Sequence, residues 1–210
     1  MRVALFATCL VDFMRPSVGF AAAKLLQQAG CKVDVPVAQT CCGQPAWNNG
    51  DANNARHLAR QMIDVFYDYD YVIVPSGSCA GMLRHHYPTV LADDPDYSLK
   101  ASELAVRCHE LTGFLVDVLG VTSTEAGFDG RLTWHDSCSC LREMQVSQQP
   151  RQLLTSLPGC ELVELPDNEV CCGFGGTFCV KFPEISTRMV TDKVDAIVTT
   201  GATTVAAADL

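Results

Sequence analysis

The sequence predicts an α/β fold of two tandem Rossmann-like βαβαβ repeats, each with a parallel sheet, related by pseudo-two-fold symmetry. The tripeptide Cys-Cys-Gly occurs twice, at 41–43 and 171–173, and each copy follows a glycine, a short alternating apolar segment and a proline. A single cysteine precedes each doublet at nearly the same distance: Cys9 lies 32 residues before Cys41, and Cys138 lies 33 residues before Cys171.

The first repeat, residues 1–122, follows this pattern from its first residues. An apolar run predicts a strand at its start, and glycine closes the helical pattern that follows. A second helix begins at Asn-Gly-Asp and has one apolar face. The expected elements are the strand Val3–Ala7, the helix Pro16–Ala29, a strand from Cys31, the helix Asp51–Tyr67 and the strand Tyr71–Pro75.

The second repeat, residues 123–210, shows the same order. Its expected elements are the strand Arg131–His135, the helix Leu141–Leu157, a strand from Cys160, the helix Pro183–Thr200 and the strand Thr203–Ala207. An extra helix, Ser98–Leu119, is expected to link the two units.

Composition limits the function classes. The formal net charge is −9 and no Lys/Arg cluster is present, which argues against nucleic acid and anionic membranes as partners. No apolar run reaches the ~18–20 residues that span a bilayer. The N-terminus resembles a strand more than a secretory signal, so we expect a cytoplasmic protein. In that reducing compartment, 12 cysteines indicate metal or redox chemistry.

Parallel strands deliver their following loops to one edge of a sheet, where ligand sites of α/β proteins lie. Cys9, the Cys41–Cys42 doublet and Cys79 each follow an expected strand, so these four thiols should meet at that edge. The second unit should bring its own cysteines together in the same way. Its candidates are Cys138, Cys171 and Cys172.

The other cysteines are expected to play different parts. Cys31 and Cys160 begin strands whose far ends lead to the doublets, so they should lie at the opposite edge as small buried hydrophobic residues. Cys108, inside the expected linking helix, is assigned to the core. Cys140 and Cys179 lie two and seven residues from candidate ligands, and we leave their role open.

Three chemistries could use the doublets. A disulfide within a doublet is disfavoured, because adjacent Cα atoms lie ~3.8 Å apart and disulfides usually need about 4.4–6.8 Å. Zinc usually takes four ligands in short spaced pairs, which makes a contiguous pair unusual for it. An iron–sulfur cluster offers several iron atoms to neighbouring thiolates, and glycine after the doublet permits close approach of the backbone. The cysteine pattern therefore favours iron–sulfur binding, with a zinc-stabilised interaction module as the alternative.

Four stretches carry a resemblance to the CCG-domain family of cysteine-rich iron–sulfur proteins. They are the residues 39–46 (QTCCGQPA), 75–79 (PSGSC), 135–138 (HDSC) and 171–178 (CCGFGGTF). This family includes the cysteine-rich subunit of heterodisulfide reductase and the iron–sulfur subunits of glycolate oxidase and anaerobic glycerol-3-phosphate dehydrogenase. The chain is most similar to its lactate-utilisation members, and the resemblance covers essentially the whole sequence.

The resemblance implies an oxidoreductase component: an iron–sulfur electron-transfer subunit of a three-protein complex that oxidises L-lactate to pyruvate. Its partners would be a ferredoxin-type iron–sulfur subunit and a third subunit. It implies up to two clusters of the 4Fe–4S type. Cys9, Cys41, Cys42 and Cys79 would hold one, and Cys138, Cys171, Cys172 and one further cysteine the other. That last cysteine would fall at or just past Leu210, so we expect the second unit to be truncated and its cluster incomplete. A reductase of the heterodisulfide or glycolate oxidase type is the alternative within the family.

Several polar side chains flank the candidate ligands. His135 and Asp136 precede Cys138, and we expect packing and loop bonding from them rather than proton transfer. His85 and His86 are expected on a partly exposed helix face. Arg84, Arg142 and Lys181 could offset thiolate charge or bind an anionic substrate, whereas Trp47 and Phe174 should cover the doublets.

Overall fold

The structure is a computed structural model that describes residues 1–209. Its strands are β1 (Arg2–Leu5), β2 (Lys32–Asp34), β3 (Tyr71–Val74), β4 (Cys108–Glu110), β5 (Gly130–His135), β6 (Cys160–Val163) and β7 (Thr204–Ala207). Its α-helices are α1 (Cys9–Met14), α2 (Pro16–Gln28), α3 (Gln44–Asn48), α4 (Ala52–Phe66), α5 (Gly77–Gly81), α6 (Tyr87–Val90), α7 (Ser98–Arg107), α8 (Leu111–Gly113), α9 (Gln148–Thr155), α10 (Thr177–Lys181) and α11 (Pro183–Thr199). Three π-helical turns are η1 (Met82–His86), η2 (Phe114–Val118) and η3 (Ser139–Met144).

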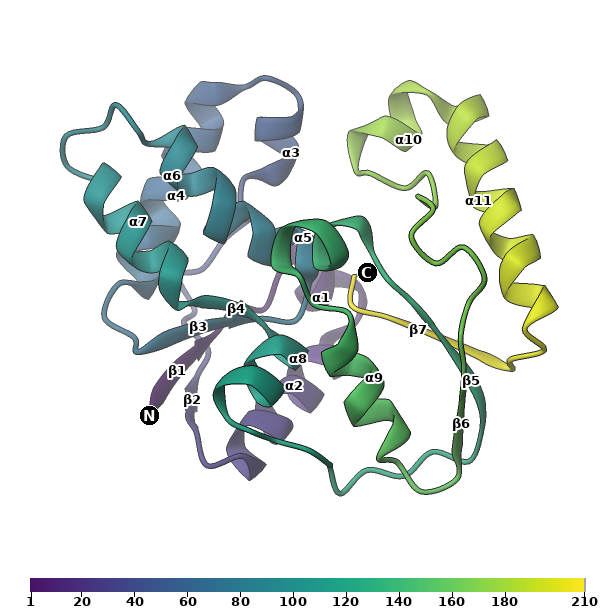
Figure 1. The fold of residues 1–210 in the computed structure, drawn as a ribbon. Helices are drawn as coiled ribbons and strands as arrows, with labels where there is room; N and C mark the ends of the chain where they lie inside the picture. Colours follow the sequence, from purple (N-terminus) through teal and green to yellow (C-terminus); the bar gives the residue numbers. More distant parts are fainter. Residues whose placement is uncertain (210) are drawn as a thin grey trace.

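Two parallel sheets confirm the predicted fold class. The first has the strand order β2-β1-β3-β4 and the second the order β6-β5-β7, and every pair in both sheets is parallel. In each unit the first strand in sequence has one partner on either side, so the two units have matching topologies apart from the additional edge strand β4 of the first. Figure 1 shows the sheets side by side, with helices packed around both.

The first sheet is covered on both faces, as parallel sheets require. Because successive side chains of a strand point to opposite faces, β1 contributes to two cores. Val3 and Leu5 pack with α2 and η2, whereas Ala4 packs with α4, α6 and α7. Most of these side chains are fully buried, so the first unit has a dense core on each side.

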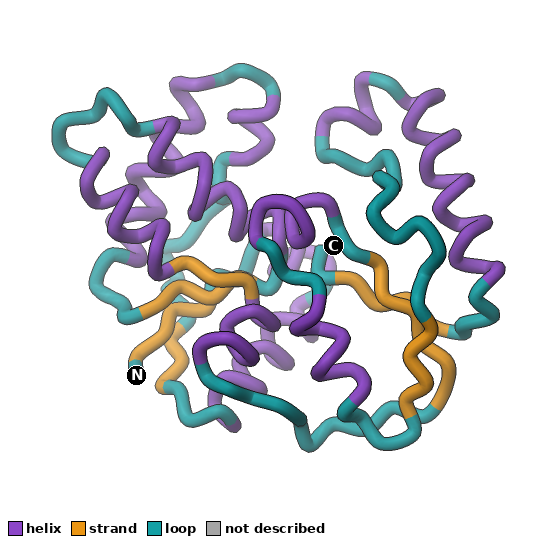
Figure 2. Tube along the Cα trace, viewed as in Figure 1, coloured by secondary structure: helices purple, strands orange, loops and turns teal. Residues whose placement is uncertain are grey.

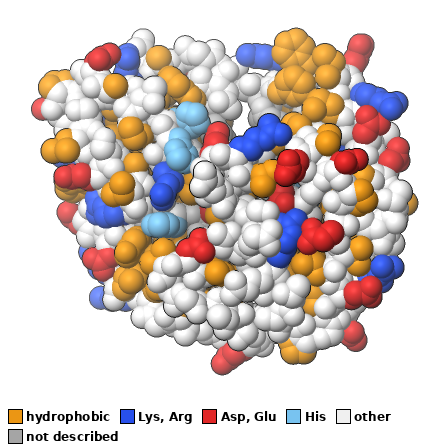
Figure 3. Space-filling view, viewed as in Figure 1, with side chains coloured by type: hydrophobic (Ala, Val, Ile, Leu, Met, Phe, Trp, Pro, Cys, Tyr) orange, Lys and Arg blue, Asp and Glu red, His pale blue; other side chains and the backbone are white. Residues whose placement is uncertain are grey.

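The second sheet is less thoroughly covered. Its best buried strand residues include Leu132 and Trp134, and Leu153 of α9 packs into the core beneath the first sheet, which joins the units. Figure 2 shows α10 and α11 on the outer side of this unit. Apolar side chains of these helices and the preceding loop remain exposed, and they form part of the apolar surface in Figure 3.

Two expected helices are wrong in their extent. The helix expected over 98–119 is instead α7, the strand β4 and the short helices α8 and η2. Cys108 therefore lies in an edge strand that pairs with β3, although it is fully buried as expected. The helix expected over 141–157 breaks into η3 and α9, because Gln145 adopts a left-handed backbone conformation.

None of the helices formed by residues 1–209 is long and apolar enough to cross a membrane.

The helix α4 begins as expected, with the Asp51 carboxylate accepting a hydrogen bond from the Asn54 amide at 3.1 Å.

Candidate cysteine centres

The first unit brings its four candidate cysteines together at the carboxyl edge of its sheet. Cys42 Sγ lies 3.3 Å from Cys79 Sγ, and the Cys41 thiol interacts with both Cys42 and Cys9. Cys42 and Cys79 are buried, Cys41 is half-buried and Cys9 is exposed. The centre is therefore open to solvent on the Cys9 side and closed on the Cys79 side.

The two cysteines of the first doublet have pKa values shifted in opposite directions. A hydrogen bond from Cys42, aided by the Gly43 amide, lowers the pKa of Cys41 to about 6. The same pairing with Cys41, together with Cys79 and burial, raises the pKa of Cys42 well above its usual value. Partial desolvation and the neighbouring Cys41 raise the pKa of Cys9. One thiolate is thus available at neutral pH without any bound cation, and thiolate is the form that binds metals.

Glycine shapes both doublets in the same way. Gly43 and Gly173 have φ angles of +86° and +81°, in the left-handed region that favours glycine. In each doublet the glycine amide donates a hydrogen bond to the first cysteine, at 3.4 Å from Cys41 Sγ and from Cys171 Sγ. A Cβ atom on Gly173 would also lie 2.7 Å from Met189 Cβ. The repeated glycine is therefore required by the turn, and in the second unit also by the close packing against α11.

Buried neighbours hold the first doublet in place. The fully buried Tyr87 donates its hydroxyl to the Cys42 carbonyl at 2.9 Å. Gln44 Nε2 donates to the Ser78 carbonyl at 3.2 Å, which ties the doublet loop to the turn that carries Cys79. Trp47 and Cys41 are both partly buried against the core cluster that contains Cys42, and the role of Trp47 as apolar cover stays a prediction.

The second unit brings Cys138 next to Cys171, and Cys172 is close enough to influence the ionisation of Cys138. Burial and Cys171 raise the pKa of Cys138, whereas Arg142 opposes this shift. All three cysteines are only partly buried. Phe174, expected to cover this doublet, is largely exposed.

A buried ionic network positions the second centre. Asp136, two residues before Cys138, accepts hydrogen bonds from Arg151 Nη2 at 2.9 Å and Trp134 Nε1 at 2.7 Å. Asn168, three residues before Cys171, donates to the same carboxylate, and its side-chain oxygen accepts from the Asp136 amide at 3.1 Å. Asp136 therefore has the structural role expected of it, although it bonds side chains rather than loop amides. The role of Arg151 and Asn168 in this network was not predicted, because no motif in their local sequence indicates it.

The remaining cysteines differ in their burial and in their contacts. Cys31 is buried at the start of the strand before the first doublet, as expected. Cys160 occupies the matching place in the second unit, but it is only partly buried, because the second sheet is less thoroughly covered. Cys140 is fully buried between the units, against Gly77 of α5. Cys179 donates a hydrogen bond to the Gly176 carbonyl at 3.0 Å. Cys140 thus has a packing environment that the sequence left undecided.

Basic and histidine side chains gather on the face shown in Figure 3, with acidic side chains among them. His85 is exposed, and His86 Nε2 lies 3.5 Å from Glu143 Oε1 of the other unit. Arg84 Nη1 donates to the Cys108 carbonyl at 2.8 Å, and Arg142 Nη2 donates to the Glu169 carbonyl at 3.2 Å. These two arginines therefore already have backbone partners.

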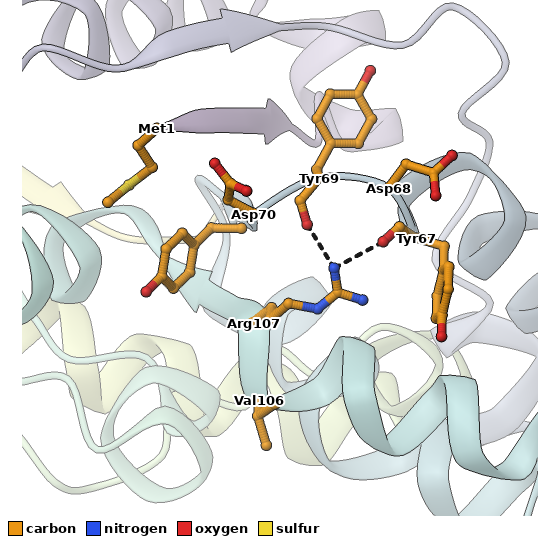
Figure 4. Close-up of a pocket in the computed structure, with 8 residues that line it drawn as sticks. Met1, Tyr67, Asp68, Tyr69, Asp70, Val106 and Arg107 are labelled. Atoms are coloured by element: carbon orange, nitrogen blue, oxygen red, sulfur yellow. Dashed lines mark hydrogen bonds between the residues drawn. The ribbon is translucent and has the colours of Figure 1, made fainter.

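A surface cavity of about 680 Å³ lies at the opposite edge of the first sheet. It is lined by Met1, Tyr67–Tyr71, Val106 and Arg107. Arg107 Nη1 donates to the Tyr67 and Tyr69 carbonyls at 2.8 and 2.6 Å, which closes the turn around it (Figure 4). Its lining contains no cysteine, so we do not assign it to the same chemistry.

Ligation itself stays a prediction. Within residues 1–209, no three His, Cys, Asp or Glu side chains already stand in an arrangement that would hold a metal ion. The expected last cysteine of the second unit, at or just past Leu210, lies outside the described residues. The donor set of the first centre, four thiols with one readily ionised, nevertheless has the composition that iron–sulfur groups use.

Two parallel sheets, each followed by a loop with a cysteine doublet and a glycine of positive φ, define a class of protein. The cysteine-rich domain family CCG matches residues 3–84 and 132–209, and the chain belongs to this family.

Among curated proteins, the chain is 46% identical to Lactate utilization protein A of Bacillus subtilis over 209 residues, which cover 100% of this chain and 87% of that protein. It is 49% identical to Lactate utilization protein A of Oceanobacillus iheyensis over 193 residues, covering 92% and 79%. The protein of the same name from Geobacillus kaustophilus is 49% identical over 197 residues, covering 94% and 82%.

Proposed function

We propose that the chain is an iron–sulfur electron-transfer subunit that takes part in the oxidation of L-lactate to pyruvate in the cytoplasm. The observation that carries the iron–sulfur part is the meeting of Cys9, Cys41, Cys42 and Cys79 at one sheet edge. Lactate is proposed from the name of the relatives, Lactate utilization protein A. Fold alone would not indicate a substrate.

The two centres would hold the group through their own cysteines. The first would use Cys9, Cys41, Cys42 and Cys79, and the second Cys138, Cys171 and Cys172 with a further ligand. When bound, an iron–sulfur group of the 4Fe–4S type supplies one-electron chemistry. The amides of Gly43 and Gly173 already donate to thiol sulfurs, and hydrogen bonds of this kind tune reduction potentials.

Lactate oxidation releases an electron pair, which one-electron carriers accept singly. We therefore propose that the chain works with partner subunits, one of them a ferredoxin-type iron–sulfur protein. Because Cys9 is exposed, we propose that a redox partner approaches the first centre from this side.

Anaerobic preparation or reconstitution of the protein tests the cofactor. We expect a brown protein that contains iron and acid-labile sulfide in equal amounts and whose visible absorption bleaches on reduction. Cys42→Ser should remove the iron of the first centre, whereas Cys31→Ser, at the opposite sheet edge, should leave iron content unchanged. Zinc without sulfide would overturn the proposal in favour of a zinc-stabilised module.

The substrate needs a separate experiment. With partner subunits present, the loaded protein should be reduced on addition of L-lactate and more slowly with glycolate. Turnover with a disulfide in place of lactate would instead indicate a reductase of the heterodisulfide type. Reduction by none of these compounds would contradict the lactate assignment while leaving the cofactor assignment intact.

A further inference from the structure

The two units meet where β7 of the second unit reaches α5 of the first. Asp209, just after β7, accepts hydrogen bonds through Oδ1 from Ser76 Oγ at 2.7 Å and from both Ser78 N and Ser78 Oγ at 3.0 Å. Through Oδ2 it accepts a hydrogen bond from Ser137 Oγ. A single carboxylate therefore accepts hydrogen bonds from Ser76 and Ser78, which precede Cys79, and from Ser137, which precedes Cys138. We call these two segments the Cys79 turn and the Cys138 turn.

Close backbone packing supports this contact. The Gly77 amide donates to the Ala208 carbonyl at 3.3 Å, so the backbone also joins the units here. A Cβ atom on Gly77 would lie 2.2 Å from Cys140 Sγ, and one on Gly81 would lie 2.0 Å from Glu143 Oε2. Helix α5 can approach η3 this closely only because it presents glycines. The junction therefore leaves little room for either cysteine turn to shift.

The chemistry of the contact calls for a carboxylate. The four donors are one amide and three hydroxyl groups, and the two oxygens of a carboxylate can accept from all of them. Hydrogen bonds to an ionised acceptor are shorter and stronger than those between neutral groups. An asparagine of the same size would keep one oxygen and would turn an NH₂ group toward either Ser137 or Ser78.

We infer that Asp209 is a positioning residue that fixes the Cys79 turn and the Cys138 turn relative to each other, so that both cysteine centres are held in one arrangement. Its consequence for clusters rests on the proposed function. The contact itself concerns only the chain's own residues, and thiol reactivity in the metal-free protein can test it directly.

The experiment compares Asp209→Asn and Asp209→Ala with a control, Asp195→Asn, an exposed carboxylate on α11. Reduced metal-free protein is alkylated and each cysteine is followed by mass spectrometry. Loss of a charge-assisted hydrogen bond changes an opening equilibrium by roughly tenfold, so Cys79 and Cys138 should react about that much faster in Asp209→Ala. Asp209→Asn should give a smaller increase, and Asp209→Glu should restore part of the protection.

The fully buried Cys108 distinguishes positioning from general loss of stability. Its alkylation should not change in the Asp209 variants. Unchanged rates at Cys79 and Cys138, or an equal rise at Cys108, would overturn the inference. If Asp209→Ala does not fold, the near-isosteric Asp209→Asn carries the same test.

A second readout concerns the loaded protein. Asp209→Asn should alter the electron paramagnetic resonance spectrum of the reduced protein, whereas Asp195→Asn should not. An unchanged spectrum together with faster alkylation would limit Asp209 to ordering the metal-free turns and would overturn its role in holding both loaded centres. A wild-type protein that binds no iron would contradict the proposed function, yet the alkylation result would still decide the role of Asp209.

Discussion

Adjacent cysteines in the first doublet differ sharply in acidity. Cys41 is half-buried with a pKa lowered to about 6, chiefly by the hydrogen bond from Cys42, whose own pKa is raised. Because thiolates are the reactive form, iodoacetamide should modify Cys41 of the metal-free protein before Cys42, with a rate that rises through about pH 6.

Removing the donor checks the cause. In Cys42→Ala the Cys41 thiolate loses its strongest hydrogen bond, so the midpoint of the rate profile should move to higher pH. Cys31→Ala, which lies at the other sheet edge, should leave it in place. Rate profiles from peptide mass spectrometry measure both, and a wild-type midpoint near that of a free thiol would contradict the assignment.

Glu110 is a second residue with an altered pKa. It is 2% exposed at the end of β4, and burial raises its pKa to about 7, against hydrogen bonds from Thr112 and Gly113 that favour the charged form. Asp209 and Cys140 face it from the second unit, and neither supplies a positive charge.

The sign of the pH effect follows from proton binding. Between the ordinary pKa of 4.5 and about 7, the folded protein holds the Glu110 proton more tightly than the unfolded chain does. The contribution of Glu110 to the free energy of unfolding is therefore fully present below pH 4.5 and is lost as the pH rises through about 7. Above that pH, the buried Glu110 carboxylate lowers the free energy of unfolding by a constant amount of about 3 kcal/mol.

Glu110→Gln should remove this loss of stability above pH 7, because glutamine carries no charge at any pH. Its gain in melting temperature over wild type should be large at pH 8 and small at pH 5. Denaturation across this range is compared with Glu169→Gln, an exposed control. A gain that does not depend on pH would show that the Glu110 carboxyl ionises normally.

At the scale of elements, the loops before Cys138 and Cys171 depend on one arginine. Arg151 is bonded to both Asp136 and Glu164, and these hydrogen bonds keep its pKa raised despite burial. Arg151→Met would leave the buried Asp136 carboxylate without its cation, which typically costs about 3–5 kcal/mol. Urea denaturation should show this loss, and iron binding by the second centre should weaken with it.

Arg188→Met provides the matched control, since Arg188 forms an exposed ion pair with Asp192 within α11. Pairs of this kind contribute about 0–1 kcal/mol. Equal losses in both variants would mean that the Asp136 network does not hold the two loops together.

Many of the helices and strands could be predicted from the periodicity of apolar residues and from the positions of glycine and proline. Glycine and proline mark the ends of α2 and α11, and the apolar face of α4 is regular, so these helices lie within two residues of expectation. The strand β4 could not be foreseen, because Cys108–Glu110 pairs with the open edge of β3 only once that sheet exists. Likewise no glycine or proline marks the break at Gln145. The break places Val146 in the junction against Gly113, a tertiary requirement.

The same division applies to the candidate centres. Gathering of thiols at one sheet edge follows from parallel topology, which the repeat predicts. Asp209, Arg151 and Asn168 bond partners that lie 133, 15 and 32 residues away in the sequence, and these partners become visible only in three dimensions.

At the scale of the whole molecule, the units differ in how well they are packed. Fully buried large side chains such as Phe6, Phe66 and Tyr87 belong to the first unit, whereas α11 of the second exposes 71% of Val198 and 55% of Ile185. Segments with fewer buried apolar contacts open more readily. Amide hydrogen exchange should therefore be faster in β5 and β7 than in β1 and β3, and equal protection would contradict this ranking.

The strand order has a further consequence for biosynthesis. Since β4 completes the first sheet at Glu110, the amino-terminal unit can begin to fold while later residues are still inside the ribosome. The second sheet must wait for β7, and Asp209 emerges behind it. In a nascent chain, the four thiols of the first centre could therefore come together before Asp209, whose carboxylate bonds the first unit to the second, has been translated.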